Sequence, residues 1–354
     1  MLVHICCSVD SHYFLKRLRE SLPNEHITGF FYNPNIHPYE EYILRLSDVK
    51  RSCKKYGIRL IEGKYDIENW WMVTKRLELE KERGKRCEVC FETRLEVTAK
   101  KAEEIGEKSI TTTLFMSPKK SFEQLSIVSN KIGQKYNLEV LCFDFRKNGG
   151  TNEQFKLARE DRLYRQNYCG CMYALNEQRA AKNKIASELI NPIGKEMLRG
   201  SIAERIKLYE KICECEDKNQ KFTIEKEEFQ NYQLLWGLVL ENGYAVHSYF
   251  IGEYKFDGSA LEVEVTKIQN GFGFTKNHIL FLDLECFNNI TCTNYKNIKD
   301  LIHNPITRPK YLDIEHKLSD YSLIIVLDKI KKTTYKIEAK SISYQDVREV
   351  LAIL

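Results

Sequence analysis

Six of the twelve cysteines stand in three close pairs within the first 171 residues. The pairs are Cys6-Cys7, Cys87-x-x-Cys90 and Cys169-Gly170-Cys171. Thiolates bind metals or exchange electrons, and a single tetrahedral zinc ion takes only four ligands. The surplus favours an iron–sulfur cluster or iron, with zinc as the alternative metal. We therefore expect the six cysteines to share one metal site.

Each pair falls at a predicted loop or element end. Cys6 and Cys7 end a first strand, where open α/β sheets place their sites. Cys87 and Cys90 immediately precede a helix predicted over 91–105, whose free amides would favour thiolates. A straight strand would send Cys169 and Cys171 to one face, and a tight turn at the intervening glycine would have the same result. A thioredoxin-like redox pair is the alternative for Cys87-x-x-Cys90, but the other cysteines fit it poorly.

Asp10 follows the first pair by three residues and has two interpretations. Asp is an ordinary N-cap residue of a helix. The alternative is an oxygen ligand or proton donor beside the metal. For His4 and His37 we expect ordinary buried or surface histidines rather than ligands.

The remaining cysteines carry weaker signals. Cys213 and Cys215 resemble a ligand pair but have no obvious companions. A single cysteine most often behaves as a small buried apolar residue. We interpret the other four in this way: Cys53, Cys142, Cys286 and Cys292.

The first half of the chain predicts alternating strands and helices. Short apolar or Thr-rich runs predict strands over 2–6, 27–32, 58–62, 109–115 and 138–145. Helical spacing of apolar residues predicts helices after residue 10, over 40–55 and over 91–105. This alternation indicates an α/β domain with a parallel sheet and helices on both faces.

After about residue 185 the pattern changes. Helices are predicted over 203–215 and 225–240, followed mainly by strands over 245–251, 261–268, 279–284, 323–328 and 335–339. We expect a metal-binding catalytic α/β domain over 1–185, a helical connector over 186–214 and an α+β domain of unknown role over 215–354.

Composition gives weaker constraints. The formal charge of +5 permits a polyanionic partner without requiring one. The N-terminus has no basic flank and no long apolar region, so it predicts a first strand rather than a signal peptide. No membrane span is predicted, because no apolar stretch approaches eighteen residues. We expect a cytoplasmic protein, where thiols stay reduced and clustered cysteines bind metals or act in redox chemistry.

The first 175 residues strongly resemble the QueH family of epoxyqueuosine reductases. The resemblance rests on His4-Ile5-Cys6-Cys7-Ser8-Val9-Asp10, Tyr32-Asn33-Pro34-Asn35-Ile36-His37-Pro38 with Glu41-Tyr42, Cys87-x-x-Cys90, Thr111-Thr112-Thr113-Leu114 with Ser117-Pro118, Asp144-Phe145-Arg146-Lys147, and Tyr164-Arg165-Gln166-x-Tyr168-Cys169-Gly170-Cys171. Many members begin with Cys-Cys-x-Pro-Cys, whereas Val9 and Asp10 stand at the last two positions here. Asp10 would then supply oxygen where other members supply sulfur.

The resemblance implies the last step of queuosine synthesis on tRNA. There an epoxide at the anticodon wobble position is reduced to an alkene, with loss of water and without cobalamin. It also implies a 4Fe-4S cluster with a nearby iron. We expect an external ferredoxin- or flavodoxin-like electron donor, which the sequence does not identify. The implied ligands are Cys6, Cys7, Asp10, Cys87, Cys90, Cys169 and Cys171, and Asp10 is the candidate acid at the reacting oxygen.

The loop after the first strand is also similar to the Ser-Gly-Gly-x-Asp-Ser loop of PP-loop ATP pyrophosphatases. This implies a PP-loop-like (HUP-type) fold for the first domain. The glycines that let backbone amides approach a phosphate are absent, so we do not expect ATP use. Two alternative functions are a PP-loop-related tRNA-modifying sulfurtransferase, which would need ATP, and a zinc-stabilised RNA-binding module.

Basic and aromatic residues near the cysteines are candidates for tRNA contacts. The basic ones would contact phosphates, and the tyrosines would stack on splayed bases. They are Lys119, Lys120, Arg146, Lys147, Arg159, Arg162, Tyr164, Arg165 and Tyr168.

Overall fold

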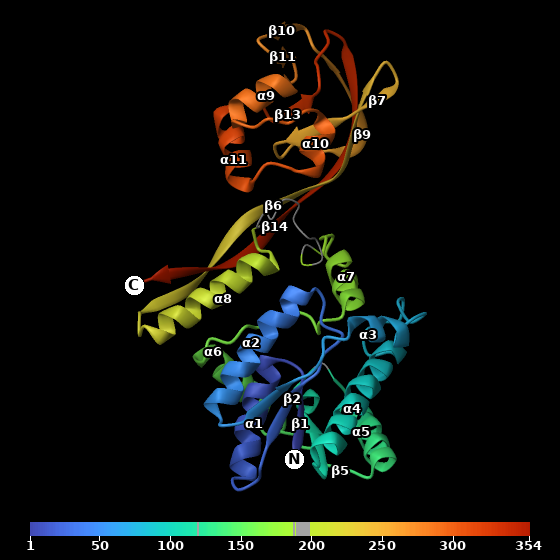
Figure 1. Ribbon diagram of the computed structural model, residues 1–354, viewed down its shortest axis with the longest axis vertical. Helices are drawn as coiled ribbons and strands as arrows, with labels where there is room; N and C mark the ends of the chain where they lie inside the picture. The colour runs from blue at the N-terminus through green and yellow to red at the C-terminus, as the bar shows by residue number, and fades with distance from the viewer. Residues whose placement is uncertain (119, 187, 189–198) are drawn as a thin grey trace. The chain divides into compact units, whose positions relative to one another are not determined.

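The computed structural model describes residues 1–118, 120–186, 188 and 199–354. The chain divides into two compact units, Met1–Leu189 (unit 1) and Ile190–Leu354 (unit 2) (Figure 1). Part of the connector predicted over 186–214 lies outside the described residues.

Five parallel strands form the centre of unit 1, in the order β3-β2-β1-β4-β5. Their bounds are β1 Leu2–Ile5, β2 Thr28–Phe31, β3 Arg59–Glu62, β4 Ser109–Thr112 and β5 Glu139–Val140. The strand order reverses between β1 and β4. In open α/β sheets, binding sites form in the crevice outside the carboxyl ends of the strands at such a switch point.

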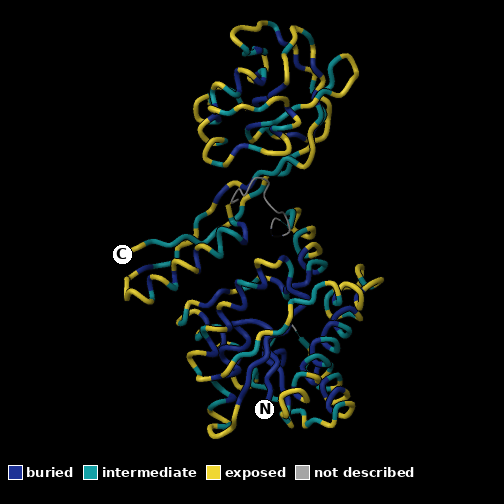
Figure 2. Tube along the Cα trace, in the orientation of Figure 1, coloured by how far each residue is buried: buried dark blue, intermediate teal, exposed yellow. Residues whose placement is uncertain are grey.

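Helices cover both faces of this sheet, and its central strands are buried (Figure 2). They are α1 Ser8–Ser21, α2 Tyr39–Lys55, α3 Ile67–Val73, α4 Lys85–Ile105, η1 Thr113–Met116, α5 Phe122–Tyr136, α6 Gly150–Glu160 and α7 Met172–Ala180. Val3 and Ile5 of β1 pack with Phe14 of α1 on one face. Leu2 of β1 packs with Leu95 of α4 on the other, as the alternation of a pleated strand requires. The predicted parallel α/β sheet is confirmed.

Unit 2 has two packed sheets. One has the order β10-β11-β12-β13-β8, with a parallel β12-β13 pair among antiparallel neighbours; the other is antiparallel with the order β7-β6-β14-β9. The strands are β6 Phe222–Glu241, β7 Tyr244–Val246, β8 Ser248–Ile251, β9 Asp257–Glu264, β10 Lys267–Gln269, β11 Phe272–Phe274, β12 Ile279–Asp283, β13 Leu323–Leu327 and β14 Thr334–Ile353. Phe281 and Ile325 of the first sheet pack with Val239 and Ile337 of the second.

Helices cover the remaining face of the five-stranded sheet in unit 2. They are α9 Leu284–Thr291, α10 Ile298–His303 and α11 Arg308–Lys317. Leu280 and Val326 pack there with Phe287 of α9 and Leu301 of α10. The further helix α8, Ile202–Asp217, is tied to β14 by the Arg348–Glu204 ion pair at 2.5 Å. The predicted α+β character is confirmed.

The helix predicted over 225–240 is wrong, because this segment is the strand β6. Its Glu, Lys, Gln and Leu residues are good helix formers in isolation. Here β6 pairs with β14 along its length, from Phe222↔Ile353 to Glu241↔Tyr335. Long-range strand pairing overrides the local helix preference.

Candidate metal centre

The three cysteine pairs lie at the N-termini of three helices. Cys7 is the N-cap residue of α1, Cys87 lies in the first turn of α4, and Cys171 is the N-cap residue of α7. The first turn of a helix has free N–H groups and the positive end of the helix dipole. Both favour a thiolate. The pKa of Cys6 and that of Cys169 are lowered, mainly by the hydrogen bonds shared with Cys7 and Cys171, whereas burial raises the pKa of Cys87.

The predicted placement of Cys87 and Cys90 before a helix is wrong. Helix α4 begins at Lys85, after the N-cap Gly84, so both cysteines lie within its first two turns. Their spacing of three residues puts them on one helix face. The backbone N–H of Arg83 donates to Cys87 Sγ at 3.2 Å. The pair therefore keeps its helix N-terminus but belongs to the helix itself.

All six cysteines and Asp10 line one cavity in unit 1, with a volume of about 160 Å³. Five of the cysteines are at most 8% exposed, and Cys169 is partly exposed. Other side chains that line the cavity include Asn35, Arg45, Trp70, Arg86, Phe91, Arg94, Lys120, Arg165 and Gln166. The structure thus brings together all seven residues predicted as ligands, while their ligand role stays a prediction.

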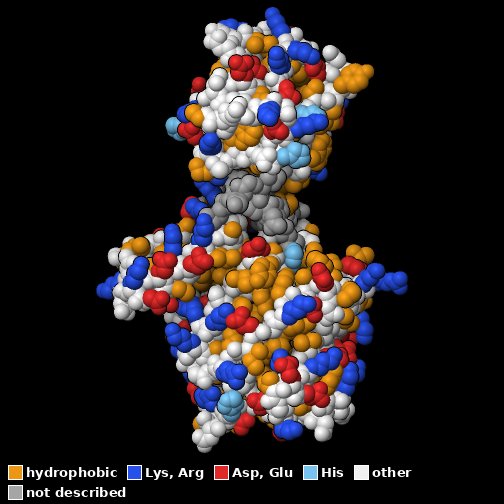
Figure 3. Space-filling model, in the orientation of Figure 1, with side chains coloured by type: hydrophobic (Ala, Val, Ile, Leu, Met, Phe, Trp, Pro, Cys, Tyr) orange, Lys and Arg blue, Asp and Glu red, His pale blue; other side chains and the backbone are white. Residues whose placement is uncertain are grey.

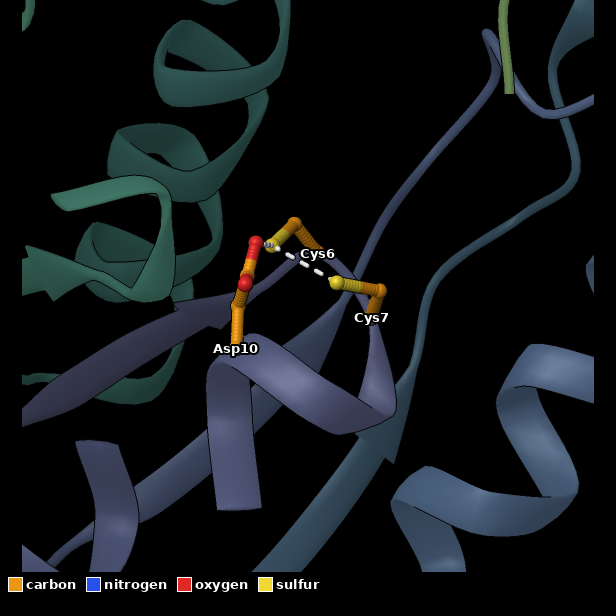
Figure 4. A group of neighbouring side chains, drawn as sticks. All are labelled: Cys6, Cys7 and Asp10. Carbon is orange, nitrogen blue, oxygen red and sulfur yellow. Dashed lines mark hydrogen bonds between the residues drawn. The ribbon is translucent and has the colours of Figure 1, made fainter. Parts of the chain in front are cut away.

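Cys6, Cys7 and Asp10 form a close group at the end of β1 (Figure 4). The two Sγ atoms are 3.5 Å apart, and Cys6 Sγ lies 3.7 Å from Asp10 Oδ2. One ligand atom from each residue lies within 4.8 Å of the other two. The hydroxyl of Thr113, after β4, accepts from Cys6 N at 3.0 Å and donates to Cys6 Sγ at 3.2 Å. The group therefore sits at the switch point between β1 and β4.

Asp10 does not cap the helix. The N-cap residue of α1 is Cys7, and no side chain makes a capping hydrogen bond there. Instead, Oδ1 of Asp10 accepts from Gln154 Nε2 of α6 at 2.6 Å. Burial raises the pKa of Asp10, and hydrogen bonds from Cys7 and Gln154 oppose that rise. The N-cap interpretation is therefore wrong, and the role of Asp10 as a ligand or proton donor stays a prediction.

Cys87, Cys90, Cys169 and Cys171 form the second group in the cavity. Three of them pack together with Trp70: Cys90, Cys169 and Cys171. The hydrogen bond shared by Cys169 and Cys171 lowers the pKa of Cys169 well below its usual value and raises that of Cys171. A group of three possible metal ligands whose ligand atoms all lie within 4.8 Å of one another occurs once within the described ranges, at Cys6, Cys7 and Asp10. The four thiols are therefore more widely spread.

Lys120 places a positive charge beside the second group. Burial lowers the pKa of Lys120, but the negative charges of Cys169, Cys87 and Cys90 outweigh this effect and raise it. Its Nζ lies 4.9 Å from the centroid of the Phe91 ring. Lys120 therefore faces the thiols rather than a phosphate on the surface. Lys119 lies outside the described residues.

Several polar atoms of the cavity wall have no hydrogen-bond partner among the described residues. They include Trp70 Nε1, Asn35 Oδ1, Arg86 Nε, Arg94 Nε and Gln166 Oε1. Buried polar groups are normally paired, so these atoms are available to bind water or another group in the cavity. Sequence reasoning missed Trp70 and Gln154, since neither belongs to a recognisable motif.

The expected stacking of Tyr164 and Tyr168 on RNA bases is wrong, because both are only 2% exposed. The Tyr164 hydroxyl donates to Glu41 at 3.0 Å, and the Tyr168 hydroxyl donates to the backbone oxygen of His37 at 2.6 Å. The guanidinium carbon of Arg45 lies 5.1 Å from the Tyr168 ring centroid. These tyrosines hold the segment before Cys169 against α2.

The basic candidates for tRNA contacts differ in exposure. Arg146 donates to Asp144 Oδ1 at 3.1 Å and to the Lys120 backbone oxygen at 2.9 Å. Lys147, Arg159, Arg162 and Arg165 are exposed. Their contacts with tRNA stay predictions.

The two histidines named above are not part of the close metal group. His4 is buried and bridges neighbouring strands, with Nδ1 2.8 Å from Thr112 Oγ1 and Nε2 donating to the Tyr32 backbone oxygen at 3.0 Å. His37 is partly exposed, and its ring centroid is 6.3 Å from that of Trp71.

The four cysteines interpreted as buried apolar residues behave differently from one another. Cys53 and Cys286 are buried, as expected, and burial raises the pKa of Cys53 to about 12. Cys142 is only partly buried. Cys292 is exposed, because it ends α9 in the left-handed conformation at a surface turn.

Comparison with known proteins assigns the family. Residues 1–177 match the family model described as "Epoxyqueuosine reductase QueH". The chain is also 39% identical to "Epoxyqueuosine reductase QueH" of Helicobacter pylori, over 98% of each protein. The chain belongs to the QueH family. The predicted resemblance is confirmed.

A second QueH relative is much shorter. "Epoxyqueuosine reductase QueH" of Thermotoga maritima is 34% identical, and the alignment covers 52% of this chain but 95% of the relative. That relative is therefore about half as long as this chain. The family model likewise ends at residue 177, so unit 2 lies outside it.

Solved structures show only distant likeness. A predicted tRNA methyltransferase subunit from Methanocaldococcus jannaschii has 14% identity and a TM-score of 0.34, covering 55% of this chain and 94% of its own. The U34-tRNA thiolase NcsA from Methanococcus maripaludis with its [4Fe-4S] cluster has 14% identity and a TM-score of 0.33, covering 49% and 60%. None of the described helices combines the length and apolar character needed to cross a membrane.

Proposed function

We propose that this protein is an epoxyqueuosine reductase that converts epoxyqueuosine in tRNA to queuosine on unit 1. The reaction adds two electrons and two protons to the epoxide, forms an alkene and releases the oxygen as water. The observation that carries the proposal is the shared cavity of six cysteines and Asp10, in a chain whose relatives bear this name. The same relatives favour the reductase over a sulfurtransferase or a zinc-stabilised RNA-binding module.

The four-cysteine group suits a [4Fe-4S] cluster. Cys87, Cys90, Cys169 and Cys171 supply the four thiolates that such a cluster requires. Around one tetrahedral ion with 2.3 Å bonds, sulfurs would lie roughly 4 Å apart. The wider spread of these four fits a larger group better. The unpaired Trp70 Nε1 beside Cys90 and Cys171 fits as well, because cluster sulfurs accept hydrogen bonds.

The close group of Cys6, Cys7 and Asp10 suits a single further iron. Its ligand atoms lie within 4.8 Å of one another, as one ion requires. Cys6, Cys7 and Asp10 would hold this iron through two sulfurs and one oxygen. When bound, the cluster supplies electrons one at a time and the iron acts as a Lewis acid on the leaving oxygen.

The protein's own residues prepare this site in three ways. Helix N-termini and Lys120 offset the negative charge of the thiolates. Gln154 holds one oxygen of Asp10 and leaves the other directed to Cys6. Burial of the thiols keeps water away from the reacting atoms. In this proposal Asp10 is either a ligand of the iron or the acid that protonates the epoxide oxygen.

The partners follow from the reaction. The substrate is the anticodon stem-loop of a tRNA, and the electrons come from an external carrier of the ferredoxin or flavodoxin class. Both partners and the cytoplasmic location belong to the proposal.

The deciding experiment is an anaerobic assay with tRNA that contains epoxyqueuosine. Iron-loaded protein with a chemical reductant should form queuosine, as detected by mass spectrometry of the nucleosides, and should have the brown absorbance of an iron–sulfur protein. Apoprotein loaded only with zinc serves as the control and should form none. A colourless preparation with zinc alone, or no queuosine from iron-loaded protein, would overturn the proposal.

A further inference from the structure

A nucleotide reaches the thiols only by leaving its stack. Five of the six cysteines that line the cavity are at most 8% exposed, so a nucleotide held in a stack or a base pair has little access to them. Enzymes that act on a buried base extrude the target nucleotide into the pocket. The nucleotides beside it then lose a stacking partner, and an aromatic protein surface can replace that partner.

Trp71 and the partly exposed His37 form an aromatic pair next in sequence to a residue that lines the cavity. Trp71 of α3 is 42% exposed, and its ring centroid is 6.3 Å from that of His37. Its neighbour Trp70 is 1% exposed and lines the cavity. Single exposed hydrophobic residues are common, so exposure alone means little. The position next to a cavity-lining residue is what distinguishes Trp71.

The metal-site loops hold this aromatic pair in place. The His37 backbone N–H donates to Gly170 O at 2.9 Å, and its carbonyl oxygen accepts from the Tyr168 hydroxyl at 2.6 Å. Trp70, which precedes Trp71, packs against cysteines of the second group. The backbone of His37 and the residue before Trp71 are therefore tied to the segments that carry the thiols, which favours a preorganised surface.

The surroundings of Trp71 suit RNA. Residues 71–86 contain six Lys or Arg residues and three Glu residues. Lys75 and Arg76 are exposed directly after α3. Hydrophobic side chains also gather on the face of unit 1 shown in Figure 3, between α2 and α3, with blue cations around them. Aromatic rings with adjacent cations are the usual combination for single-stranded nucleic acid.

We propose that Trp71 and His37 form a stacking platform for an anticodon base next to the extruded wobble nucleotide. The proposal rests on the proposed function and adds how the same site holds its RNA. The aromatic faces take the neighbouring base, and the basic residues after α3 take its phosphates. Contacts of this kind are tolerant of base identity, because every base has a π-face.

Binding of an anticodon stem-loop RNA to the full-length, iron-loaded protein tests the platform. Fluorescence anisotropy under anaerobic conditions should show that Trp71→Leu raises Kd about tenfold, in the range of one lost stacked base. Trp71→Phe keeps an aromatic ring and should stay within about threefold of the parent. The matched control is Trp236→Leu, because Trp236 is 47% exposed on unit 2. Its Kd should be unchanged.

A double-mutant cycle identifies the base. An abasic nucleotide placed next to the wobble position, on one side and then the other, should weaken binding to the parent protein. On the side whose base stacks on Trp71, the abasic RNA has already lost that base. It should therefore bind the parent protein and the Trp71→Leu variant with the same Kd. Iron content and visible absorbance should match the parent, which excludes a general folding defect. If Trp71→Leu disturbs the iron site, His37→Ala is measured in the same cycle.

The outcomes separate this proposal from the proposed function. Unchanged Kd in Trp71→Leu, or no coupling to either neighbouring nucleotide, overturns the platform even if queuosine is formed. Coupling without queuosine formation would support the platform while overturning the reductase proposal. With tRNA as substrate, Trp71→Leu should raise KM and leave kcat unchanged.

Discussion

The two units bury very different side chains. Among the described residues, the buried charged side chains all lie in unit 1: Asp10, Glu41, Arg45, Asp48, Arg86, Arg94 and Glu188. The clusters of unit 2 are built from aliphatic and aromatic residues between two sheets and three helices. Buried charges are costly and gather at functional sites. The comparison indicates that unit 1 is organised around its cavity and unit 2 around its core.

Charge follows the same division. Unit 1 contains 33 Lys or Arg residues against 26 Asp or Glu, whereas unit 2 contains 22 against 24. The positive charge of the chain therefore belongs to unit 1, which also holds the cysteine pairs. A polyanion such as tRNA would be attracted to unit 1 rather than to unit 2.

The largest expected effect is the loss of a cluster thiolate. We expect Cys87→Ala to abolish queuosine formation and to lose most of the bound iron, because a four-cysteine cluster has no spare ligand. Iron analysis and visible absorbance measure the loss. Cys53→Ala is the matched control, since Cys53 is also buried in unit 1 but lies outside the cavity. It should keep both iron and activity, and retention of both by Cys87→Ala would remove this pair from the site.

Asp10→Asn should lower turnover by about 100-fold or more, within the range for a lost acid or ligand. The substitution preserves shape but removes the negative charge. The cluster absorbance should remain, because the four-cysteine group is intact. Iron analysis decides between the roles: loss of one iron per chain indicates a ligand, and full iron content indicates the proton donor. Normal turnover would contradict both.

Gln154→Leu should reduce activity about tenfold, as expected for a residue that orients a metal ligand. It removes the 2.6 Å hydrogen bond to Asp10 while keeping a side chain of similar size. The spectroscopic signal of the single iron should change, and that of the cluster should not. The control Gln124→Leu removes a hydrogen bond to Glu88 outside the cavity and should leave both signals unchanged. A fall in thermal stability without a change in the iron signal would mean a purely structural role.

The smallest effect on activity is expected from unit 2. Phe281 is fully buried in its core, so Phe281→Ala should destabilise unit 2 by about 3–5 kcal/mol. Iron content and turnover should remain within about twofold of the parent. Phe14→Ala is the counterpart in the core of unit 1, also fully buried, and should reduce iron loading and activity. Loss of iron in Phe281→Ala would show that the two units do not act independently.

Local sequence patterns were sufficient to predict much of the fold of unit 1. The five strands and the helices α1, α2 and α4 were predicted from period and turn residues, whereas α3, α5, α6 and α7 were not predicted. Each cysteine pair was visible as a short motif. Two contributors to the site were not. Gln154 contacts Asp10 across 144 residues of sequence. Trp70 belongs to no recognisable motif. Its position beside the cysteines and its unpaired N–H result from the packing of α3 against them, which the sequence does not reveal.

The wrong predictions for the two tyrosines and for the 225–240 segment also arose from contacts between distant parts of the chain. Tyr164 and Tyr168 lie in a loop without periodicity, so nothing in the sequence revealed that both rings are buried against α2. The 225–240 segment was read from helix propensity, but its pairing with β14 is a long-range interaction. Contacts between distant segments are what a single sequence does not contain.

The spacing of the three cysteine pairs has a consequence for the unfolded chain. Roughly 80 residues separate Cys7 from Cys87, and a similar number separates Cys90 from Cys169. A metal group that joins these pairs closes two long loops, much as disulfides do, and removes entropy from the unfolded ensemble. The metal would then act as a cross-link within the chain as well as a catalytic cofactor. Without it, unit 1 should unfold at a lower temperature, while unit 2, which supplies none of the seven predicted ligands, should not.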